Sequence, residues 1–395
     1  MVLLHAWMFF NRRREIVTGY PDFTIFYTAG KCVIERCGPQ LYDLETQLKI
    51  QREFASEVKD RDNPLPFNHP PFEALLFAPL ARLPYVTAYI VWAGINILLI
   101  LGFWNLLRPF LTSLQHFLPA FPLLAMFAFF PVSMALLQGQ DSVLLLCLYG
   151  LAFSALAKGR AFVAGLCLGL ALFKFQLVLP FVLVLLLRRQ WRVVAGFMST
   201  AFVLFLVSAA VVGWSGLMAY PGFVLSLNRS APQAGIYPRD MPNLRGLVAG
   251  SLHLTGVPAT LLITALSIAL LVLVAHWWRE PRGRRFELGF SLCVTVTTIT
   301  SYHLLVHDLS LLILPILLLA ELLVSGEIVG RGRYLLIACL VVLFLTPLYS
   351  VLQFSFREMN LMVIPVAVFA AGTAMALISK KELAGSEPAP STISG

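Results

Sequence analysis

The chain has 395 residues, of which 59% are hydrophobic and 12% are charged, and its mean hydropathy is +0.82. Soluble domains average ~45–50% apolar and ~25% charged residues, so this composition excludes an ordinary soluble protein. The net charge of +9 comes from basic residues in short clusters between apolar runs, as the positive-inside rule requires. We therefore predict an all-α polytopic integral membrane protein, in contact with membrane lipid and with no nucleic-acid partner.

The first ten residues are apolar but too few to cross a bilayer, and Arg12, Arg13 and Arg14 follow directly. This stretch resembles the remains of a signal peptide or of a first span. We expect either a start upstream of Met1 or an abnormally short first helix.

A polar segment, residues 20–70, precedes the full-length apolar spans. Apolar residues on helical spacing over 22–38 and 44–58 predict two helices along the membrane surface. Cys32 and Cys37 stand five residues apart on the first of them, an awkward geometry for a disulfide. The segment also holds most of the acidic residues that precede the spans: Asp22, Asp43, Glu45, Glu53, Glu57, Asp60 and Asp62.

Apolar runs of about 20 residues then recur to the end of the chain. We expect 161–187 to be interrupted at Lys174, as two short helices that meet there. Residues 1–380 form one domain, and the Ser-, Pro- and Gly-rich tail 381–395 is expected to be disordered. After a short helix at 72–83, the candidate spans are about 84–108, 118–137, 142–157, 161–187, 193–213, 257–278, 286–301, 305–325, 334–350 and 360–379.

The basic clusters set the expected orientation. All of them can be cytoplasmic if 161–187 enters the membrane and returns. The polar residues that lack a structural explanation then collect on the extracytoplasmic face, where we place the candidate site. The segments on that face are the first extracytoplasmic loop 20–70, the turn 138–141, Lys174, the second long loop 214–256 and the turn 301–308.

Asp22 and Lys174 are the first candidates for chemistry. Asp22 opens a predicted helix, where it can be an N-cap or a general base, and nothing local decides. Lys174 lies within an apolar run, at a cost of ~2.5–3.5 kcal/mol at a helix centre, so it needs a partner or a function. It can snorkel to the interface, or its ammonium can bind the phosphate of a lipid-linked substrate.

The remaining candidates have equally open alternatives. His303, His307 and Asp308 lie where two spans meet and could serve structure or catalysis; their spacing supplies only two metal ligands. Arg239 and Arg245 stand in a long loop, a kind that is uncommon unless functional or disordered, and could contact phosphate or glycan or be solvated. In the turn, Gln140 or Asp141 could contact substrate, although a plain turn is favoured.

Loose motifs stand in order along most of the chain. They are Asp22-Phe23-Thr24-Ile25-Phe26-Tyr27 with Leu41-Tyr42-Asp43, Phe67-Asn68-His69-Pro70-Pro71 running into Phe77-Ala78-Pro79-Leu80, Trp92 with Asn96, Gly139-Gln140, Gly165 to Gly169, Lys174, Asn243-Leu244-Arg245-Gly246, and Tyr302 to Pro315. In this order the chain resembles the polyprenol-phosphate-mannose-dependent glycosyltransferases of the GT-C superfamily, in particular the bacterial family numbered 87. It departs from them in its missing first helix and in Phe175, where a proline is common.

The resemblance implies a GT-C-like helix bundle with interfacial helices in its first extracytoplasmic loop, in a bacterial inner membrane. Asp22 would be the base that deprotonates an acceptor hydroxyl, which then displaces phosphate from a polyprenyl-phosphate sugar with inversion. The acceptor would be a lipid-linked or envelope glycan. The substrate-binding residues would be Lys174, His307, Arg239, Arg245, His69, Gln140, Tyr302 and Asp308.

Because phosphate is a good leaving group, we predict no metal and no cofactor. The leading hypothesis is an inverting mannosyltransferase. The alternative is a membrane transporter or lipid flippase, although the sequence has no internal repeat of the kind common in transporters. A third hypothesis is a non-catalytic partner in an envelope complex.

Overall fold

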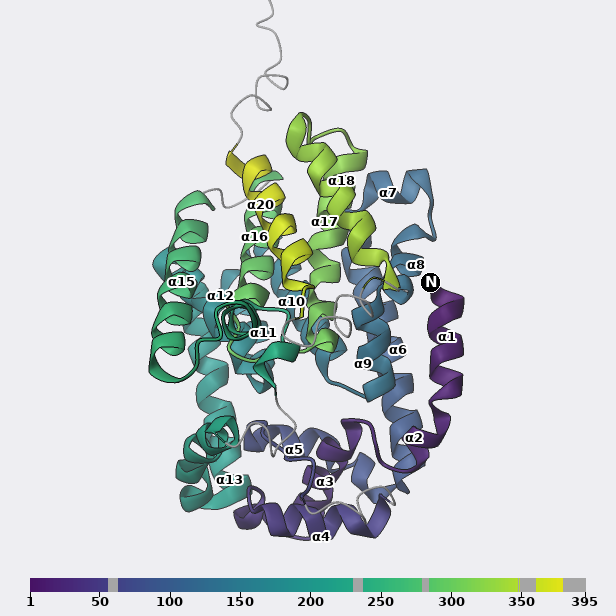
Figure 1. The fold of residues 1–395 in the computed structure, drawn as a ribbon, viewed down its shortest axis with the longest axis vertical. Coiled ribbons are helices and arrows are strands. Elements are labelled where there is room, and N and C mark those ends of the chain that lie inside the picture. The colour runs from purple at the N-terminus through teal and green to yellow at the C-terminus, as the bar shows by residue number, and fades with distance from the viewer. Residues whose placement is uncertain (56–62, 230–236, 279–283, 347, 349–359, 379–395) are drawn as a thin grey trace, which may run out of the picture.

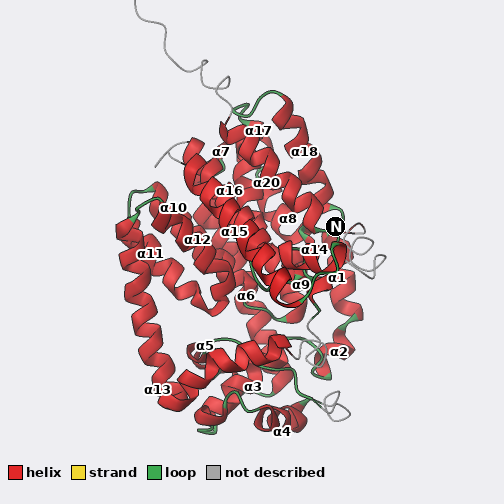
Figure 2. Ribbon diagram, turned by 60° about the vertical axis from the view of Figure 1, so that its left-hand side comes forward, coloured by secondary structure: helices red, strands yellow, loops and turns green. Residues whose placement is uncertain are grey.

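The computed structural model describes residues 1–395 except 56–62, 230–236, 279–283, 347, 349–359 and 379–395, so the expected disordered tail lies outside the described residues. Within the described ranges the secondary structure is helical, with no strand (Figure 2). This confirms the predicted all-α class.

The helices form a large bundle and a smaller layer across one end of it (Figure 1). The layer holds α3 (Phe23–Ile34), α4 (Leu44–Phe54) and α5 (Pro71–Phe77). The bundle includes α6 (Tyr85–Leu107), α8 (Phe121–Ala128), α9 (Phe130–Gln138), α10 (Ser142–Ala157), α11 (Ala161–Leu170), α12 (Phe175–Leu187), α15 (Gly256–Trp277), α16 (Arg284–Thr300), α17 (Ile313–Val324), α18 (Arg331–Phe344) and α20 (Val363–Ile378).

Each predicted span overlaps a helix or a broken helix, although the end of the span predicted at 334–350 lies outside the described residues. Among the described residues, five helices are long and apolar enough to cross a membrane, or six if α8 and α9, bent by 60°, count as one span. The helices α10, α16, α18 and α20 lie where spans were predicted but have 14 to 17 residues each. The break expected at Lys174 is confirmed, because the short 3-10 helix η5 (Ala171–Lys174) separates α11 from α12.

The helix α13 (Trp191–Arg229) connects the two parts of the molecule, since it packs on α11 in the bundle and on α5 in the layer. It changes direction at Gly213, whose φ of 72° favours glycine. Much of the stretch 214–256, expected as a loop, is therefore helical. Beyond the undescribed 230–236, it continues with η6 (Pro238–Asp240) and α14 (Leu244–Ser251).

Residues 1–17 form two short helices, α1 (Val2–Asn11) and α2 (Arg13–Val17), beside the bundle (Figure 1).

The N-terminal region differs from expectation at its cysteines. Cys32 and Cys37 are joined by a disulfide, contrary to the prediction. The prediction assumed one continuous helix, whereas α3 ends at Ile34 and the chain reverses through Arg36, at φ 60°, so that the two Cα atoms lie 5.0 Å apart.

Two separate apolar cores stabilise the two parts. One lies within the bundle and includes Phe103, Phe153 and Phe181. The other joins the layer to the start of α6 and the middle of α13, and includes Phe23 and Phe77. Polar side chains that connect the bundle to the layer therefore lie between two apolar cores.

The contact between α11 and α13 depends on a glycine. A Cβ on Gly165 would lie 2.0 Å from the Val193 carbonyl oxygen, so the helices would have to separate. We expect Gly165→Ala to lower the free energy of unfolding by about 1–3 kcal/mol, the usual cost of overpacking. Thermal unfolding in detergent, followed by tryptophan fluorescence, measures this.

Gly102→Ala in α6 is the matched control, because a Cβ there meets no atom within 4 Å. It should leave the melting temperature unchanged or slightly higher, since alanine favours the helix. Equal melting temperatures for the two variants would contradict the close packing described here.

Candidate active site

The turn between α9 and α10 is held rigidly against α6. Gly139 ends α9 in the left-handed region, at φ 61°. The Trp92 indole Nε1 donates to the Gly139 carbonyl oxygen at 2.9 Å, and the Tyr89 hydroxyl donates to the Leu137 carbonyl oxygen at 2.8 Å. Gln140 and Asp141 are therefore presented from a fixed backbone at the level of the layer.

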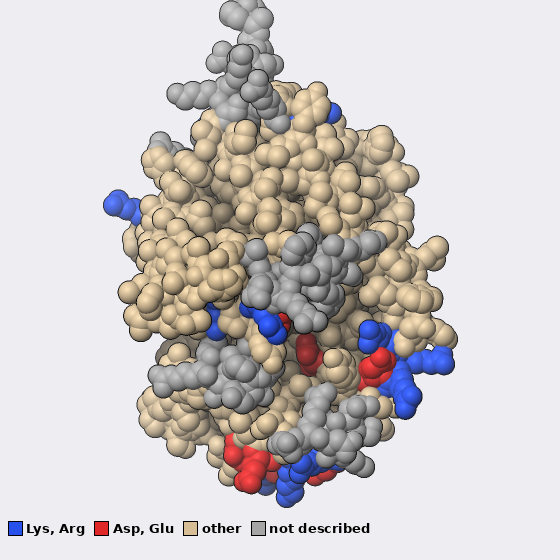
Figure 3. Space-filling model, viewed as in Figure 1, with Lys and Arg blue, Asp and Glu red and all other residues tan. Residues whose placement is uncertain are grey.

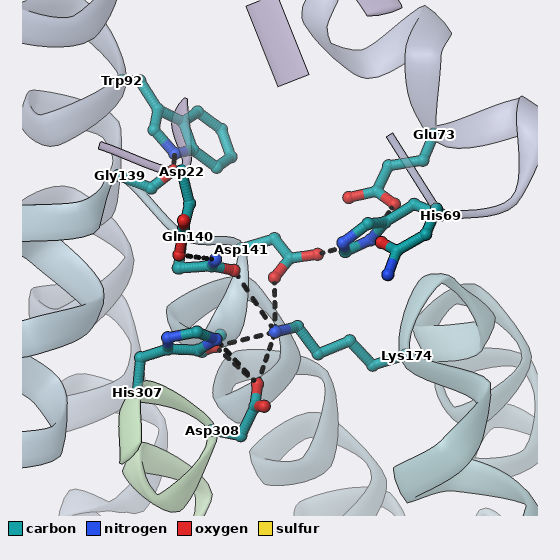
Figure 4. A network of polar contacts seen from close by, with 12 residues as sticks. Asp22, His69, Glu73, Trp92, Gly139, Gln140, Asp141, Lys174, His307 and Asp308 are labelled. Carbon is teal, nitrogen blue, oxygen red and sulfur yellow. Dashed lines mark hydrogen bonds and ion pairs between the residues drawn. The ribbon is translucent and has the colours of Figure 1, made fainter. Parts of the chain in front are cut away.

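Asp22 precedes α3, but its side chain does not cap the helix. Instead, Gln140 Nε2 donates to Asp22 Oδ2 at 2.7 Å (Figure 4). The Asp22 backbone N–H donates to Gln138 Oε1 at 3.3 Å. Asp22 is half-buried. The sequence left open whether Asp22 is an N-cap or a general base. Its side chain does not cap α3, and its carboxylate faces the turn between α9 and α10.

Lys174 is 2% exposed and does not snorkel to solvent. Its ammonium lies 2.9 Å from Asp141 Oδ1 and 2.5 Å from Asp308 Oδ1, and it donates to the Ser142 hydroxyl at 3.0 Å. Gln140 Oε1 is a weaker contact at 3.4 Å. Two buried carboxylates thus surround the one buried ammonium.

Asp308 is held from several directions. It lies in the 3-10 helix η7 (Val306–Leu312), which precedes α17. Its Oδ2 accepts from the Leu305 N–H at 3.0 Å, and its Oδ1 also accepts from the Ser142 hydroxyl at 3.1 Å. His307 Nε2 lies 3.6 Å from the same Oδ1, so that η7 contributes both an acid and an imidazole.

His69 and Glu73 approach the same cluster from the layer. His69 Nδ1 lies 2.7 Å from Glu73 Oε2 and 3.6 Å from Asp141 Oδ2. Burial lowers the pKa of His69 to about 4, because desolvation disfavours the charged imidazole. Burial, together with the nearby Asp141 carboxylate, raises the pKa of Glu73 well above its usual value.

These side chains form one polar network between the two apolar cores. It consists of Asp22, His69, Glu73, Gln140, Asp141, Ser142, Lys174, His307 and Asp308 (Figure 4). Figure 3 shows a recess at the level between bundle and layer, with acidic and basic atoms in it. The four acids of the network outnumber its one ammonium, and three acids still face that ammonium when the raised pKa of Glu73 keeps this residue neutral.

The structure brings together Asp22, His69, Gln140, Lys174, His307 and Asp308 of the residues predicted from the sequence. The other three make contacts of their own. The Arg245 guanidinium lies 4.2 Å from the centre of the Tyr302 ring and donates to the Tyr302 carbonyl oxygen at 3.3 Å. The Arg239 guanidinium lies over Tyr237, 4.8 Å from the ring centre.

Sequence reasoning missed Glu73 and Ser142 and gave Asp141 only a minor place. Glu73 is the one charge in the apolar helix α5 and follows His69 by four residues, a signal that could have found it. Asp141 reads as a turn residue, and only the tertiary fold shows it 0% exposed beside Lys174.

The fold and the site define a polytopic helical membrane protein with a buried, charged site between its bundle and its terminal layer. The sequence model of glycosyltransferase family 87 matches residues 67–307, more than half of the chain, and the chain belongs to this family. It is therefore a membrane glycosyltransferase, as the resemblance implied. Comparisons with curated proteins and with solved structures found no significant match.

The family match covers only part of the network. It includes His69, Glu73, Gln140, Asp141 and Lys174, together with Arg239, Arg245, Tyr302 and His307. Asp22 precedes the matched residues, and Asp308 directly follows them. The part these two residues play in the site is therefore argued from the geometry of this chain.

The Lys174 cluster provides a direct test of this geometry. Lys174→Met leaves Asp141 and Asp308 buried without their cation, and breaking a buried pair usually costs about 3–5 kcal/mol. We expect a large fall in melting temperature in detergent. Lys31→Met is the matched control, because Lys31 also pairs with two acids, Glu35 and Glu53, but at the surface.

An exposed pair contributes about 0–1 kcal/mol, so Lys31→Met should have little effect on stability. A Lys174→Met protein as stable as the Lys31→Met protein would show that the buried contacts of Lys174 contribute little.

Proposed function

We propose that this membrane glycosyltransferase moves a mannosyl group from a polyprenyl-phosphate donor to a hydroxyl of a lipid-linked or envelope glycan acceptor. The observation that carries the proposal is the position of Asp22. Its carboxylate starts a helix without capping it and is held by Gln140, whose own oxygen lies 3.4 Å from Lys174. A half-buried carboxylate oriented in this way suits a general base.

In the proposed reaction, Asp22 takes the proton of the acceptor hydroxyl as its oxygen attacks the anomeric carbon of the donor sugar. The bond from that carbon to the phosphate oxygen breaks, and polyprenyl phosphate leaves with the electron pair. Attack opposite to the leaving group inverts the anomeric centre. Asp22 needs only to accept one proton, and Gln140 keeps its carboxylate in place for that step.

The donor phosphate requires positive groups around it. We propose that Lys174 and His307 lie nearest to it within the network, and that Arg239 and Arg245 approach it from the segment that follows α13. Lys174 already forms ion pairs with Asp141 and Asp308. The phosphate would therefore bind to the ammonium together with these two carboxylates and would not replace them. His69, Tyr302 and Asp308 complete the proposed substrate-binding set.

We further propose that the site faces the extracytoplasmic side of a bacterial inner membrane. The positive-inside pattern of the basic linkers supports this orientation. The disulfide between Cys32 and Cys37 in the layer supports it independently, because disulfides persist in oxidising compartments such as the periplasm and are rare in the cytosol. A polyprenyl-linked sugar is a donor suited to that side of the membrane.

The central test is Asp22→Asn in purified full-length protein reconstituted in vesicles. Loss of a general base typically costs about 10²–10⁴ in rate, so we expect transfer from polyprenyl-phosphate mannose to fall at least that far while folding stays intact. Product is measured by mass spectrometry with a panel of acceptor lipids. Polyprenyl-phosphate glucose, offered in parallel, tests the choice of sugar.

Asp43→Asn is the matched control, since Asp43 also precedes a helix but caps it, accepting from the Thr46 N–H at 2.9 Å. Asparagine caps equally well, so this variant should keep wild-type transfer. Full transfer by Asp22→Asn would remove the assigned base. Uptake of a solute by vesicles without any donor would instead favour a transporter.

A further inference from the structure

Three potential metal ligands converge where the layer meets the bundle. They are His69 Nδ1, Glu73 Oε2 and Asp141 Oδ2, and the ligand atoms of this group all lie within 4.8 Å of one another. His69 and Glu73 come from the layer at the start of α5, and Asp141 comes from the start of α10. One ion could therefore bind both parts of the molecule.

The two acids of this group are buried, and hydrogen bonds do not fill the capacity of their carboxylate oxygens. Glu73 is 2% exposed and Asp141 is 0% exposed. Among the described residues, the carboxylate oxygens of both, and His69 Nδ1, have no hydrogen bond of acceptable geometry. Buried acids are normally paired or coordinate a metal, and the ion-pair contact of Lys174 is with Asp141 Oδ1.

We propose that His69, Glu73 and Asp141 bind one divalent metal ion of the Mn²⁺ or Zn²⁺ type. An imidazole nitrogen with two carboxylate oxygens suits such borderline cations better than it suits soft ones. Three protein ligands leave at least one coordination position open, as in catalytic rather than structural sites. This differs from the expectation from the sequence, which was that no metal binds, and which weighed possible metal ligands only among His303, His307 and Asp308.

Lys174 makes the site more specific rather than blocking it. Its ammonium contacts Asp141 Oδ1, whereas the oxygen nearer to His69 is Oδ2. The lysine thus fixes the rotation of the carboxylate, in the way that hydrogen-bonding partners behind metal ligands orient them. A cation on Oδ2 would leave the contacts of Lys174 with Asp308 and Ser142 in place.

A divalent cation would also resolve the charge balance of the network. Its acids outnumber its one ammonium, which opposes the binding of an anionic phosphate. Two added positive charges offset much of this excess, and the open coordination position could accept a phosphate oxygen. The assignment to the donor phosphate rests on the proposed function, whereas binding of the ion does not.

The test uses the full-length protein, purified with chelator and then dialysed into nanodiscs. Mn²⁺ is titrated in and its free concentration is followed by electron paramagnetic resonance; Zn²⁺ is measured separately by elemental analysis. We expect one ion per chain. Pulsed measurements on bound Mn²⁺ should show coupling to one imidazole nitrogen, a signature of His69 that needs no variant.

His69→Gln and Glu73→Gln each remove one ligand. Loss of a partner behind a ligand already weakens metal sites by about 10–100-fold, so loss of a ligand should weaken binding by at least about 100-fold. His116→Gln and Glu45→Gln, at exposed positions, are the matched controls and should bind as the wild type does. Folding of each variant is checked by size-exclusion chromatography.

The proposal is overturned if the wild type binds neither ion stoichiometrically, or if bound Mn²⁺ shows no nitrogen coupling. Undiminished binding by both folded ligand variants would overturn it as well. Because these readouts use no sugar donor, they are independent of the transferase assay. Metal binding without transfer from polyprenyl-phosphate mannose would leave the site standing and remove only the proposed donor.

Discussion

The structure depends on one buried ammonium held between two buried carboxylates. Lys174 cannot reach water, so its insertion is tolerated only because Asp141 and Asp308 receive it. This pairing ties the break between α11 and α12 to the start of α10 and to η7. The break between α11 and α12, the turn before α10 and η7 therefore meet at one point, where the protein buries their irregular backbone.

The same point also positions the layer of α3, α4 and α5. Gln140 reaches Asp22 from the turn that Trp92 and Tyr89 hold, and His69 lies near Asp141 from the other side. Each part has an apolar core of its own. The polar network thus fixes how the layer sits on the bundle and does not supply most of the stability. Buried polar contacts are directional, whereas apolar contacts are not.

The charge of the site constrains any account of its chemistry. A glycosyltransferase with an anionic donor needs positive charge where the phosphate binds, yet the only buried ammonium of the network is already paired with two acids. Other positive charge near the phosphate is therefore needed. The proposed cation at His69, Glu73 and Asp141 and the arginines after α13 are the candidates for it. Asp22 lies at the edge of the network and is half-buried, and for this reason we propose it, rather than one of the deeper acids, as the base.

The sequence by itself determined the helical membrane class, the approximate positions of most apolar helices and the break at Lys174, because the length of apolar runs and a lone charge within one are local properties. It also singled out Asp22, Gln140, His307 and Asp308, and the order of its loose motifs indicated the family. It failed on the disulfide between Cys32 and Cys37, because the apolar spacing did not show that α3 ends at Ile34, between the two cysteines. Only the tertiary structure showed that Lys174 is enclosed by acids and that Glu73 and Asp141 face His69. A charge within an apolar stretch of sequence indicates that a partner is needed, but it does not indicate which residue is that partner.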